Sequence, residues 1–256
     1  MKFGISDLTV VPIRKDPSDK SEMVSQLLFG EHFKITESDE KWSKIIVSHD
    51  NYSGWICNKQ IRLIKEETYN KFKNVKPYIS TKLFDVVVKN DITQTISAGS
   101  IIPNYKDGIS FIENEKFIFK GTVKKQGKEN IEKIVDVAMA FLNTPYLWGG
   151  RTAFGIDCSG LVQIAYRLIG INLPRDASQQ IEYGNEITDI NKSKIGDLAF
   201  FNNEKGAIIH VGILIGKNKI IHASGMVRIN NLDKKGIFNK LANNYTHTLN
   251  KIKRIL

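Results

Sequence analysis

The sequence predicts an α+β fold in the second half of the chain, preceded by one or two small all-β barrels. Three patterns support this prediction. Apolar residues follow a helical period over 161–169, and two apolar segments at 207–215 and 219–224 flank a short turn. Residues 8–63 alternate between apolar and polar and are interrupted by turn residues. A helix followed by antiparallel strands is typical of α+β proteins.

Composition is that of a globular protein. The 256 residues suffice for one large domain or for two to three small ones, and 41% hydrophobic with 25% charged residues is an ordinary balance. We predict no membrane partner, because no apolar run approaches the length of a bilayer span. Residues 1–7 do not resemble a signal peptide, so we expect a cytoplasmic protein. Removal of an export signal from a periplasmic or extracellular protein would leave the same sequence.

The formal net charge of +10 comes largely from dispersed lysines. They form no long run and no stripe interleaved with aromatic residues, which favours a solvated basic surface over a nucleic-acid footprint. A substrate that carries carboxylates would also suit this charge. The sequence does not indicate an oligomeric state.

The first half of the chain is predicted to form a small barrel over 1–65 and a second, divergent one over 66–126. Leu-Leu-Phe-Gly-Glu at 27–31, Trp-Ser-Lys-Ile at 42–45 and Gly-Trp-Ile at 54–56 resemble a bacterial SH3-like domain. A generic β-domain without defined function is the alternative. Residues 65–76 are interpreted as a polar connector, and residues 124–128 as the linker into the last domain, 127–256.

The last domain is predicted to begin with a helix over 130–142, capped by Asn130 and ended at Pro145. A second helix should follow Cys158 and stop at Gly170, and a short third helix is expected over 177–183. Strands are predicted at 196–201, 207–215 and 219–224, the last two as a hairpin.

The chain has two cysteines, which cannot form a disulfide framework and include no C-x-x-C pair. Cys57 lies in an alternating segment and is interpreted as core or strand-end packing. Cys158 lies at the start of a helix, where free backbone N–H groups and the helix dipole favour a thiolate. A small core cysteine that begins a helix is the alternative.

Two histidines give Cys158 a chemical context. His210 and His222 are predicted on the paired strands of the hairpin, and a cysteine with two histidines suits nucleophilic thiol catalysis. Cys158 would attack a carbonyl, His210 would carry the proton to the leaving amine, and His222 would orient His210. A zinc site formed by the same three residues is the competing use.

These residues lie in motifs that resemble the NlpC/p60 cysteine peptidases, which have a reduced papain-like fold. The matching segments are Tyr-Leu-Trp-Gly-Gly at 146–150, Asp-Cys-Ser-Gly-Leu-Val at 157–162, Leu-Pro-Arg-Asp-Ala-Ser-Gln-Gln at 173–180, Gly-Asp-Leu-Ala-Phe-Phe at 196–201, His-Val-Gly-Ile-Leu-Ile-Gly at 210–216 and Ile-His-Ala-Ser at 221–224. The resemblance implies Cys158 as nucleophile, His210 as base and His222 as the orienting residue, without cofactor or metal. It also implies that Tyr146 and the Cys158 N–H stabilise the oxyanion, and that Asp157 shapes the substrate groove.

With its SH3-like front half, the chain is similar to the subgroup that cleaves γ-D-glutamyl–diamino acid bonds in free cell-wall peptides. The resemblance implies a murein peptide substrate with a free N-terminal L-Ala, and release of L-Ala-γ-D-Glu in cell-wall recycling. The residues that it assigns to the amine are Asp176, Ser159, Tyr52 and Glu22. Asp176 could instead cap the helix that follows it, Ser159 could be only a first-turn residue, and the other two could be barrel surface.

Other functions remain open from the sequence. The chain could be a wall-lytic endopeptidase or amidase on intact peptidoglycan, with the SH3-like domains as anchors. It could be a non-catalytic wall-binding module, or a papain-like acyltransferase. The residues do not decide between lysine and meso-diaminopimelate as the diamino acid.

Overall fold

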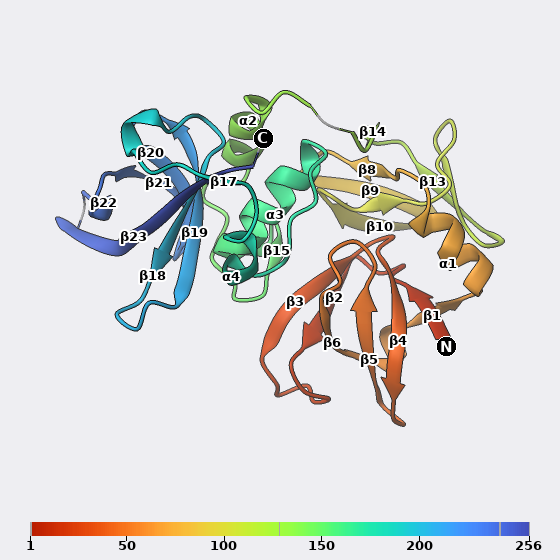
Figure 1. Cartoon of the computed structure of the whole chain (residues 1–256). Helices are drawn as coiled ribbons and strands as arrows, with labels where there is room; N and C mark the ends of the chain where they lie inside the picture. Colours follow the sequence, from red (N-terminus) through yellow and green to blue (C-terminus); the bar gives the residue numbers. More distant parts are fainter. Residues whose placement is uncertain (1, 128, 241, 256) are drawn as a thin grey trace. The chain divides into compact units, whose positions relative to one another are not determined.

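The computed structural model describes residues 2–127, 129–240 and 242–255, which fall into two compact units. The first unit comprises Met1–Gly127 and Trp148–Ala153, and the second comprises Lys128–Leu147 and Phe154–Leu256. Figure 1 labels their helices and strands. Among the described residues, no helix has both the length and the apolar character that crossing a bilayer requires.

The first unit begins with seven antiparallel strands in one sheet, in the order β3-β2-β6-β5-β4-β1-β7. The strands are β1 (Lys2–Ile5), β2 (Val10–Arg14), β3 (Met23–Leu28), β4 (His32–Ser38), β5 (Trp42–Val47), β6 (Ser53–Cys57) and β7 (Arg62–Ile64), with a 3-10 turn at Asn58–Gln60. Their inward side chains, among them Val11, Leu27, Phe33 and Ile45, form an apolar core. The small all-β domain predicted here is confirmed, although the strands begin at Lys2, before the predicted start at residue 8.

A helix stands where the sequence suggested a polar connector. Helix α1 spans Glu66–Lys73, so the interpretation of residues 65–76 as a connector is wrong. Tyr69 and Phe72 lie three positions apart, on one helical face, and both are buried against the core. These two anchors stabilise a helix whose remaining residues are polar.

The rest of the first unit forms two small sheets, in the orders β10-β9-β13-β12 and β11-β8-β14. The strands are β8 (Tyr78–Ser80), β9 (Phe84–Lys89), β10 (Ile92–Ser97), β11 (Ile101–Ile102), β12 (Ile109–Ile112), β13 (Glu115–Phe119) and β14 (Val123–Lys125). Because β14 pairs with β8, residues 124–125 belong to a sheet and not to a linker. Lys128, the end of the predicted linker, lies outside the described residues.

One core joins the two predicted barrels. Phe3 of β1 and Phe29, which follows β3, pack in the same cluster as Val87, Phe117 and other residues beyond 84. The backbone crosses this core closely: the Ile101 N–H donates to the Phe29 carbonyl at 2.9 Å. Gly30, with φ +77°, permits this approach, since a Cβ there would lie 2.1 Å from the Ile101 carbonyl oxygen. The division at 65/66 stays a prediction.

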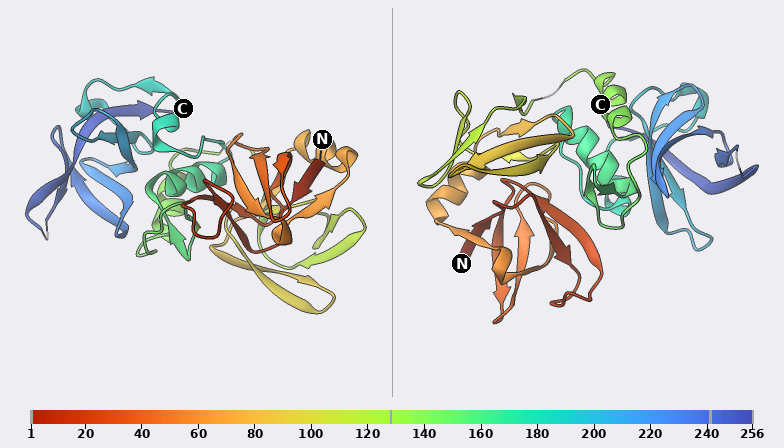
Figure 2. Two further views of the ribbon diagram at one scale, coloured as in Figure 1. Left: turned by 90° about the horizontal axis from the view of Figure 1, so that it is seen from below. Right: turned by 180° about the vertical axis from the view of Figure 1, so that it is seen from behind.

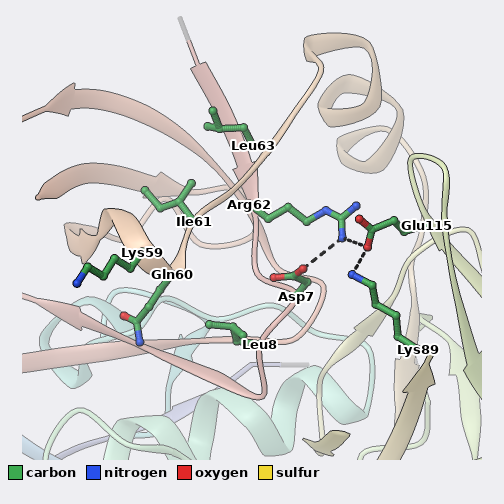
Figure 3. A pocket seen from close by; sticks show the side chains of 9 residues that line it. All are labelled: Asp7, Leu8, Lys59, Gln60, Ile61, Arg62, Leu63, Lys89 and Glu115. Carbon is green, nitrogen blue, oxygen red and sulfur yellow. Dashed lines mark hydrogen bonds and ion pairs between the residues drawn. The ribbon is translucent and has the colours of Figure 1, made fainter. Parts of the chain in front are cut away.

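A hollow in the first unit is lined by charged groups that neutralise one another (Figure 3). Arg62 donates to Asp7 at 3.2 Å and to Glu115 at 2.7 Å, and Lys89 also pairs with Glu115. The residues that line it include no cysteine or histidine. The network therefore ties β7 to β9 and β13 and brings no nucleophile to this hollow.

The second unit contains a six-stranded barrel. Strands β18 to β22 pair in order, and β23 pairs with both β18 and β22, which closes the sheet, while β17 adds to β23. The strands are β16 (Gly155–Ile156), β17 (Asn185–Glu186), β18 (Leu198–Asn202), β19 (Ile208–Gly216), β20 (Lys219–Ser224), β21 (Met226–Leu232), β22 (Gly236–Asn239) and β23 (Asn244–Arg254), and β15 (Arg151–Thr152) belongs to the first unit. Figures 1 and 2 show the strands from β18 onward in blue. This α+β fold confirms the predicted class, but the strands beyond residue 224 were not predicted.

Three helices accompany the barrel: α2 (Lys133–Ala140), α3 (Cys158–Leu168) and α4 (Ala177–Gln180), with a 3-10 turn at Ile190–Lys192. Helix α3 packs on β19 and β20, and all of its residues are buried. Helix α2 is shorter than predicted and begins after Glu132, whose N–H donates to the Asn130 side chain at 3.0 Å. Helix α4 ends at Gln180 rather than at residue 183.

Candidate active site

Cys158 is the first residue of α3, as the sequence predicted. Asp157 caps the helix, and its Oδ1 accepts a hydrogen bond from the Gly160 N–H at 2.7 Å. The Cys158 side chain is only 7% exposed. The nucleophile candidate is therefore held by a capped helix start and shielded from bulk water.

The helix start does not make Cys158 a resting thiolate. Burial and the neighbouring Asp157 charge raise the pKa of the Cys158 thiol to about 12. The backbone N–H groups of Val211 and Ser159 donate to the sulfur and act in the opposite direction, but they are outweighed. The expectation of a helix-start thiolate is wrong, because desolvation exceeds the dipole effect here.

The two histidines meet on the β19–β20 hairpin. His210 Nε2 and His222 Nδ1 lie 2.8 Å apart, and both side chains are buried. Burial, followed by the charge of His222, lowers the pKa of His210, and burial lowers the pKa of His222 to about 4. Both imidazoles are therefore neutral near pH 7. Gly212 makes room for His222 and its neighbour Ile220, since a Cβ there would lie 2.9 Å from the Cβ of His222.

Asn230 of β21 sets the tautomers of both rings. Its Nδ2 donates to the Phe238 carbonyl at 3.4 Å, and its Oδ1 lies 3.0 Å from His222 Nε2. Because a carbonyl oxygen only accepts, His222 Nε2 carries the proton and its Nδ1 is an acceptor. His210 then donates from Nε2, which leaves His210 Nδ1 as the basic atom. The sequence analysis missed Asn230, which carries no local motif.

The histidine geometry bears on the zinc alternative. The two nitrogens that face each other are hydrogen-bonded to one another and do not converge on a third point. In the parts of the chain that the structure describes, no group of three or more His, Cys, Asp or Glu side chains could hold a metal ion. The geometry favours proton transfer over metal binding.

Tyr146 lies close enough to Cys158 for their charges to interact. Burial, followed by the charge of Cys158, raises the pKa of Tyr146, so its phenol is neutral and can donate a hydrogen bond. Its position is fixed by β21 and the turn before it: the Tyr146 N–H donates to the Gly225 carbonyl at 3.0 Å, and Val227 donates to Thr144 at 2.8 Å.

A buried ion pair lies beside the nucleophile. Arg175 Nη1 and Nη2 donate to Asp157 Oδ1 and Oδ2 at 3.0 and 2.5 Å, and Nη1 also donates to Ser159 Oγ at 2.8 Å. The structure thus places Asp157 as helix cap and ion-pair partner, while its predicted role in the substrate groove stays a prediction. Arg175 was missed as a site residue, although its place in the Leu-Pro-Arg-Asp motif could have indicated it.

Arg175→Met is expected to lower the free energy of unfolding by about 3–5 kcal/mol, because it removes the guanidinium that pairs with the buried Asp157 charge. Urea denaturation of the full chain measures this loss. Lys251→Met, which removes an exposed pair with Glu186, is the control and should cost less than about 1 kcal/mol. Equal losses in the two variants would contradict the importance of the buried pair.

The amine-site candidates of the second unit have other partners as well. Asp176 caps α4 in a capping box with Gln179, whose Oε1 accepts from the Asp176 N–H at 3.2 Å. Ser159 Oγ donates to Asp157 at 3.3 Å and accepts from Arg175. The alternative structural role is thus realised for Asp176. Neither arrangement excludes a ligand, since carboxylate and hydroxyl oxygens accept more than one hydrogen bond.

Glu22 and Tyr52 lie in the first unit, and their part in the site stays a prediction. Glu22 is exposed and accepts a hydrogen bond from Trp148 Nε1 at 2.7 Å. Tyr52 is half-buried in the turn between β5 and β6, where its N–H donates to Asp50 at 3.0 Å. Glu22 therefore touches the segment that follows Tyr146 in the sequence.

Comparison with known proteins agrees with this geometry. Residues 143–245 match the NlpC/P60 family, and residues 13–61 match the bacterial dipeptidyl-peptidase Sh3 domain. The chain is 31% identical to a gamma-D-glutamyl-L-lysine dipeptidyl-peptidase of Bacillus subtilis (strain 168) over 78% of its length and 71% of that protein. It is 25% identical to dipeptidyl-peptidase 6 of Lysinibacillus sphaericus, over 86% and 88%.

The fold has a close counterpart among solved structures. The crystal structure of an NlpC/P60 family protein from Bacillus cereus ATCC 10987 superposes with a TM-score of 0.84 and covers 99% of both chains, at 21% sequence identity. This likeness extends over both units of the fold. By its matched domains, its relatives and its cysteine–histidine site, the chain belongs to the NlpC/P60 family and is a cysteine peptidase.

Proposed function

We propose that the protein hydrolyses the γ-D-glutamyl–diamino acid bond of murein peptides that begin with a free L-Ala, and that it releases L-Ala-γ-D-Glu. The observation that carries this proposal is the directed relay from Asn230 through His222 to His210, on the hairpin against which Cys158 lies. The names of the relatives, gamma-D-glutamyl-L-lysine dipeptidyl-peptidases, support the substrate class.

The relay defines how the thiol is activated. His210 Nδ1 removes the thiol proton as the Cys158 sulfur attacks the γ-carbonyl carbon, so that charge develops only during the reaction. His222 accepts from His210 Nε2 throughout and keeps this tautomer in place. Neutral resting groups suit a buried site, where a permanent ion pair would be costly.

The remaining steps follow from the same groups. The Tyr146 hydroxyl and the Cys158 N–H donate to the oxyanion of the tetrahedral intermediate. The intermediate collapses when His210 gives its proton to the departing amine of the diamino acid. A water molecule, deprotonated by His210, then attacks the thioester and releases the dipeptide and the thiol.

Recognition of the free amine would give the enzyme its substrate choice. Asp176 supplies the anion for the L-Ala ammonium and Ser159 supplies an acceptor, while the part assigned to Glu22 and Tyr52 stays a prediction. A site that binds an ammonium through buried polar groups rejects a substrate that lacks it. The recycling role and a cytoplasmic location remain predictions.

Hydrolysis of L-Ala-γ-D-Glu-L-Lys and of the same peptide acetylated on its amine, followed by mass spectrometry, tests this function. We expect kcat/KM to be at least about 10²-fold higher for the free peptide, and to fall above about pH 8, where a peptide amine loses its proton. Equal cleavage of both peptides would refute the amine gate, and cleavage of neither would refute the proposed substrate.

Asp176→Asn tests the anchor without loss of the helix cap, because asparagine caps helices well. We expect it to lower kcat/KM for the free peptide about 10²-fold and to leave the slow hydrolysis of the acetylated peptide nearly unchanged. Asp189→Asn, at the cap of the 3-10 turn in the same unit, is the matched control. An equal effect of both variants would contradict the anchor.

A further inference from the structure

A third imidazole lies on the catalytic base candidate. The rings of His247 and His210 stack with centroids 4.1 Å apart and 27° between their planes. His222 meets both rings edge-on, at 5.0 Å from His210 and 5.8 Å from His247. His247 belongs to β23, the strand that closes the barrel, and thus lies far from His210 in sequence.

The stack is held from several sides. Phe201 of β18 contacts both His210 and His247, with centroid distances of 5.7 and 5.9 Å. His247 Nδ1 lies 2.9 Å from the Thr246 hydroxyl, which constrains the ring. His247 is half-buried, whereas His210 is only 5% exposed. His247 therefore covers the base and is itself the imidazole with more access to solvent.

The surroundings offer the base no counter-charge from the barrel. Strands β18 to β23 all lie within the described residues and carry no aspartate or glutamate. Within the barrel, Arg228 of β21 is the charged group that acts on His222, while β18 and β22 carry no titratable residue. Cys158 of α3 lies against β19, where the Val211 N–H donates to its sulfur. Asp157, beside Cys158, is paired with Arg175. An imidazolium on His210 would thus depend on neighbouring rings for stabilisation.

We propose that His247 is a positioning residue that holds the His210 ring and whose protonation disables the base. This inference rests on the role proposed above for His210. When His247 is neutral, its ring face supports the imidazolium that forms during attack. When it is protonated, a like charge stacked at 4.1 Å opposes that imidazolium. Burial, then the charges of His222 and His247, lower the pKa of His210, which agrees with this repulsion.

The test compares kcat/KM against pH for the wild type, His247→Phe and His247→Ala. Phenylalanine keeps a stacked ring but cannot be protonated. In His247→Phe, the fall of kcat/KM on the acid side of the profile should therefore occur at lower pH than in the wild type. Alanine loses the ring, and kcat/KM at pH 8 should fall about tenfold, more than for phenylalanine. Substrate ionisation affects all three proteins alike and cancels in their ratios.

Tyr245→Phe is the matched control, since Tyr245 lies on the same strand but is exposed and donates to Asp233. Its pH profile should equal that of the wild type. The proposal would be overturned if kcat/KM fell at the same acidic pH in His247→Phe and the wild type. It would also be overturned if His247→Ala kept wild-type kcat/KM at pH 8.

Alkylation of Cys158 by iodoacetamide gives a readout that needs no peptide substrate. As the pH is lowered, the rate of Cys158 alkylation should fall at lower pH in His247→Phe than in the wild type. Identical plots of alkylation rate against pH for the two proteins would overturn the proposal. If the wild type fails to cleave the peptide, the proposed function fails, but the alkylation profiles still decide the role of His247.

Discussion

Cys158→Ala is expected to reduce kcat/KM for the free murein peptide by about 10⁴-fold or more, because it removes the sulfur that forms the thioester in the proposed mechanism. His210→Ala should cost a similar factor, and the double variant should cost little more than either single change. Such non-additivity is typical of groups that act as one unit. Initial rates of lysine release measure all three variants.

The other cysteine provides the control. Cys57, at the end of β6 in the first unit, is partly buried and belongs to no part of the site. Cys57→Ala should therefore keep wild-type kcat/KM, and iodoacetamide should still inactivate it. If Cys158→Ala keeps activity while Cys57→Ala loses it, the nucleophile has been misassigned.

Arg151→Met is expected to lower the free energy of unfolding by about 3–5 kcal/mol, since it removes the guanidinium that pairs with the buried Glu31 carboxylate. Arg151 and Glu31 are both buried and form two hydrogen bonds, at 2.9 and 3.0 Å. Gln26 accepts two further bonds from Arg151: its backbone carbonyl accepts from Nη1 at 2.6 Å, and its Oε1 accepts from the backbone N–H at 2.8 Å. Urea denaturation of the full chain measures the loss.

The same variant should also lose activity. Residues 148–153 belong to the first unit, yet in sequence they connect Tyr146 with Cys158. Lys44→Met, which breaks an exposed pair with Glu37 in the same domain, is the control and should cost less than about 1 kcal/mol. Adding Glu31→Gln to Arg151→Met should recover part of the stability. Losses no larger than that of the control would contradict the buried clamp.

The sequence predicted those features that local patterns encode. The period of α3 and the turn between β19 and β20 are both short-range signals, and they place Cys158, His210 and His222. The alternating strands of the first domain were visible for the same reason. A local signal also existed for α1, but Tyr69 and Phe72 form too narrow an apolar stripe among charged residues to stand out.

The missed parts depend on contacts between distant segments. Asn230 and His247 are polar residues without a motif of their own, and only strand pairing brings them to the site. Arg175 lies in the Leu-Pro-Arg-Asp motif, but only the fold places its guanidinium against Asp157 and Ser159. The pKa of Cys158 could not be predicted either, because a helix position indicates the dipole but not the extent of burial. Residues 148–153 likewise join the first unit through residues far away in the sequence, because Arg151 bonds to Gln26 and Glu31.

Hydrolysis of L-Ala-γ-D-Glu-L-Lys in ¹⁸O-labelled water tests the central claim most directly. If the enzyme hydrolyses the γ-D-glutamyl bond, mass spectrometry should show one ¹⁸O in the released L-Ala-D-Glu, at the γ-carboxyl, and none in lysine. Release of free L-Ala carrying the label, or the absence of any labelled dipeptide, would contradict cleavage at the γ-D-glutamyl bond.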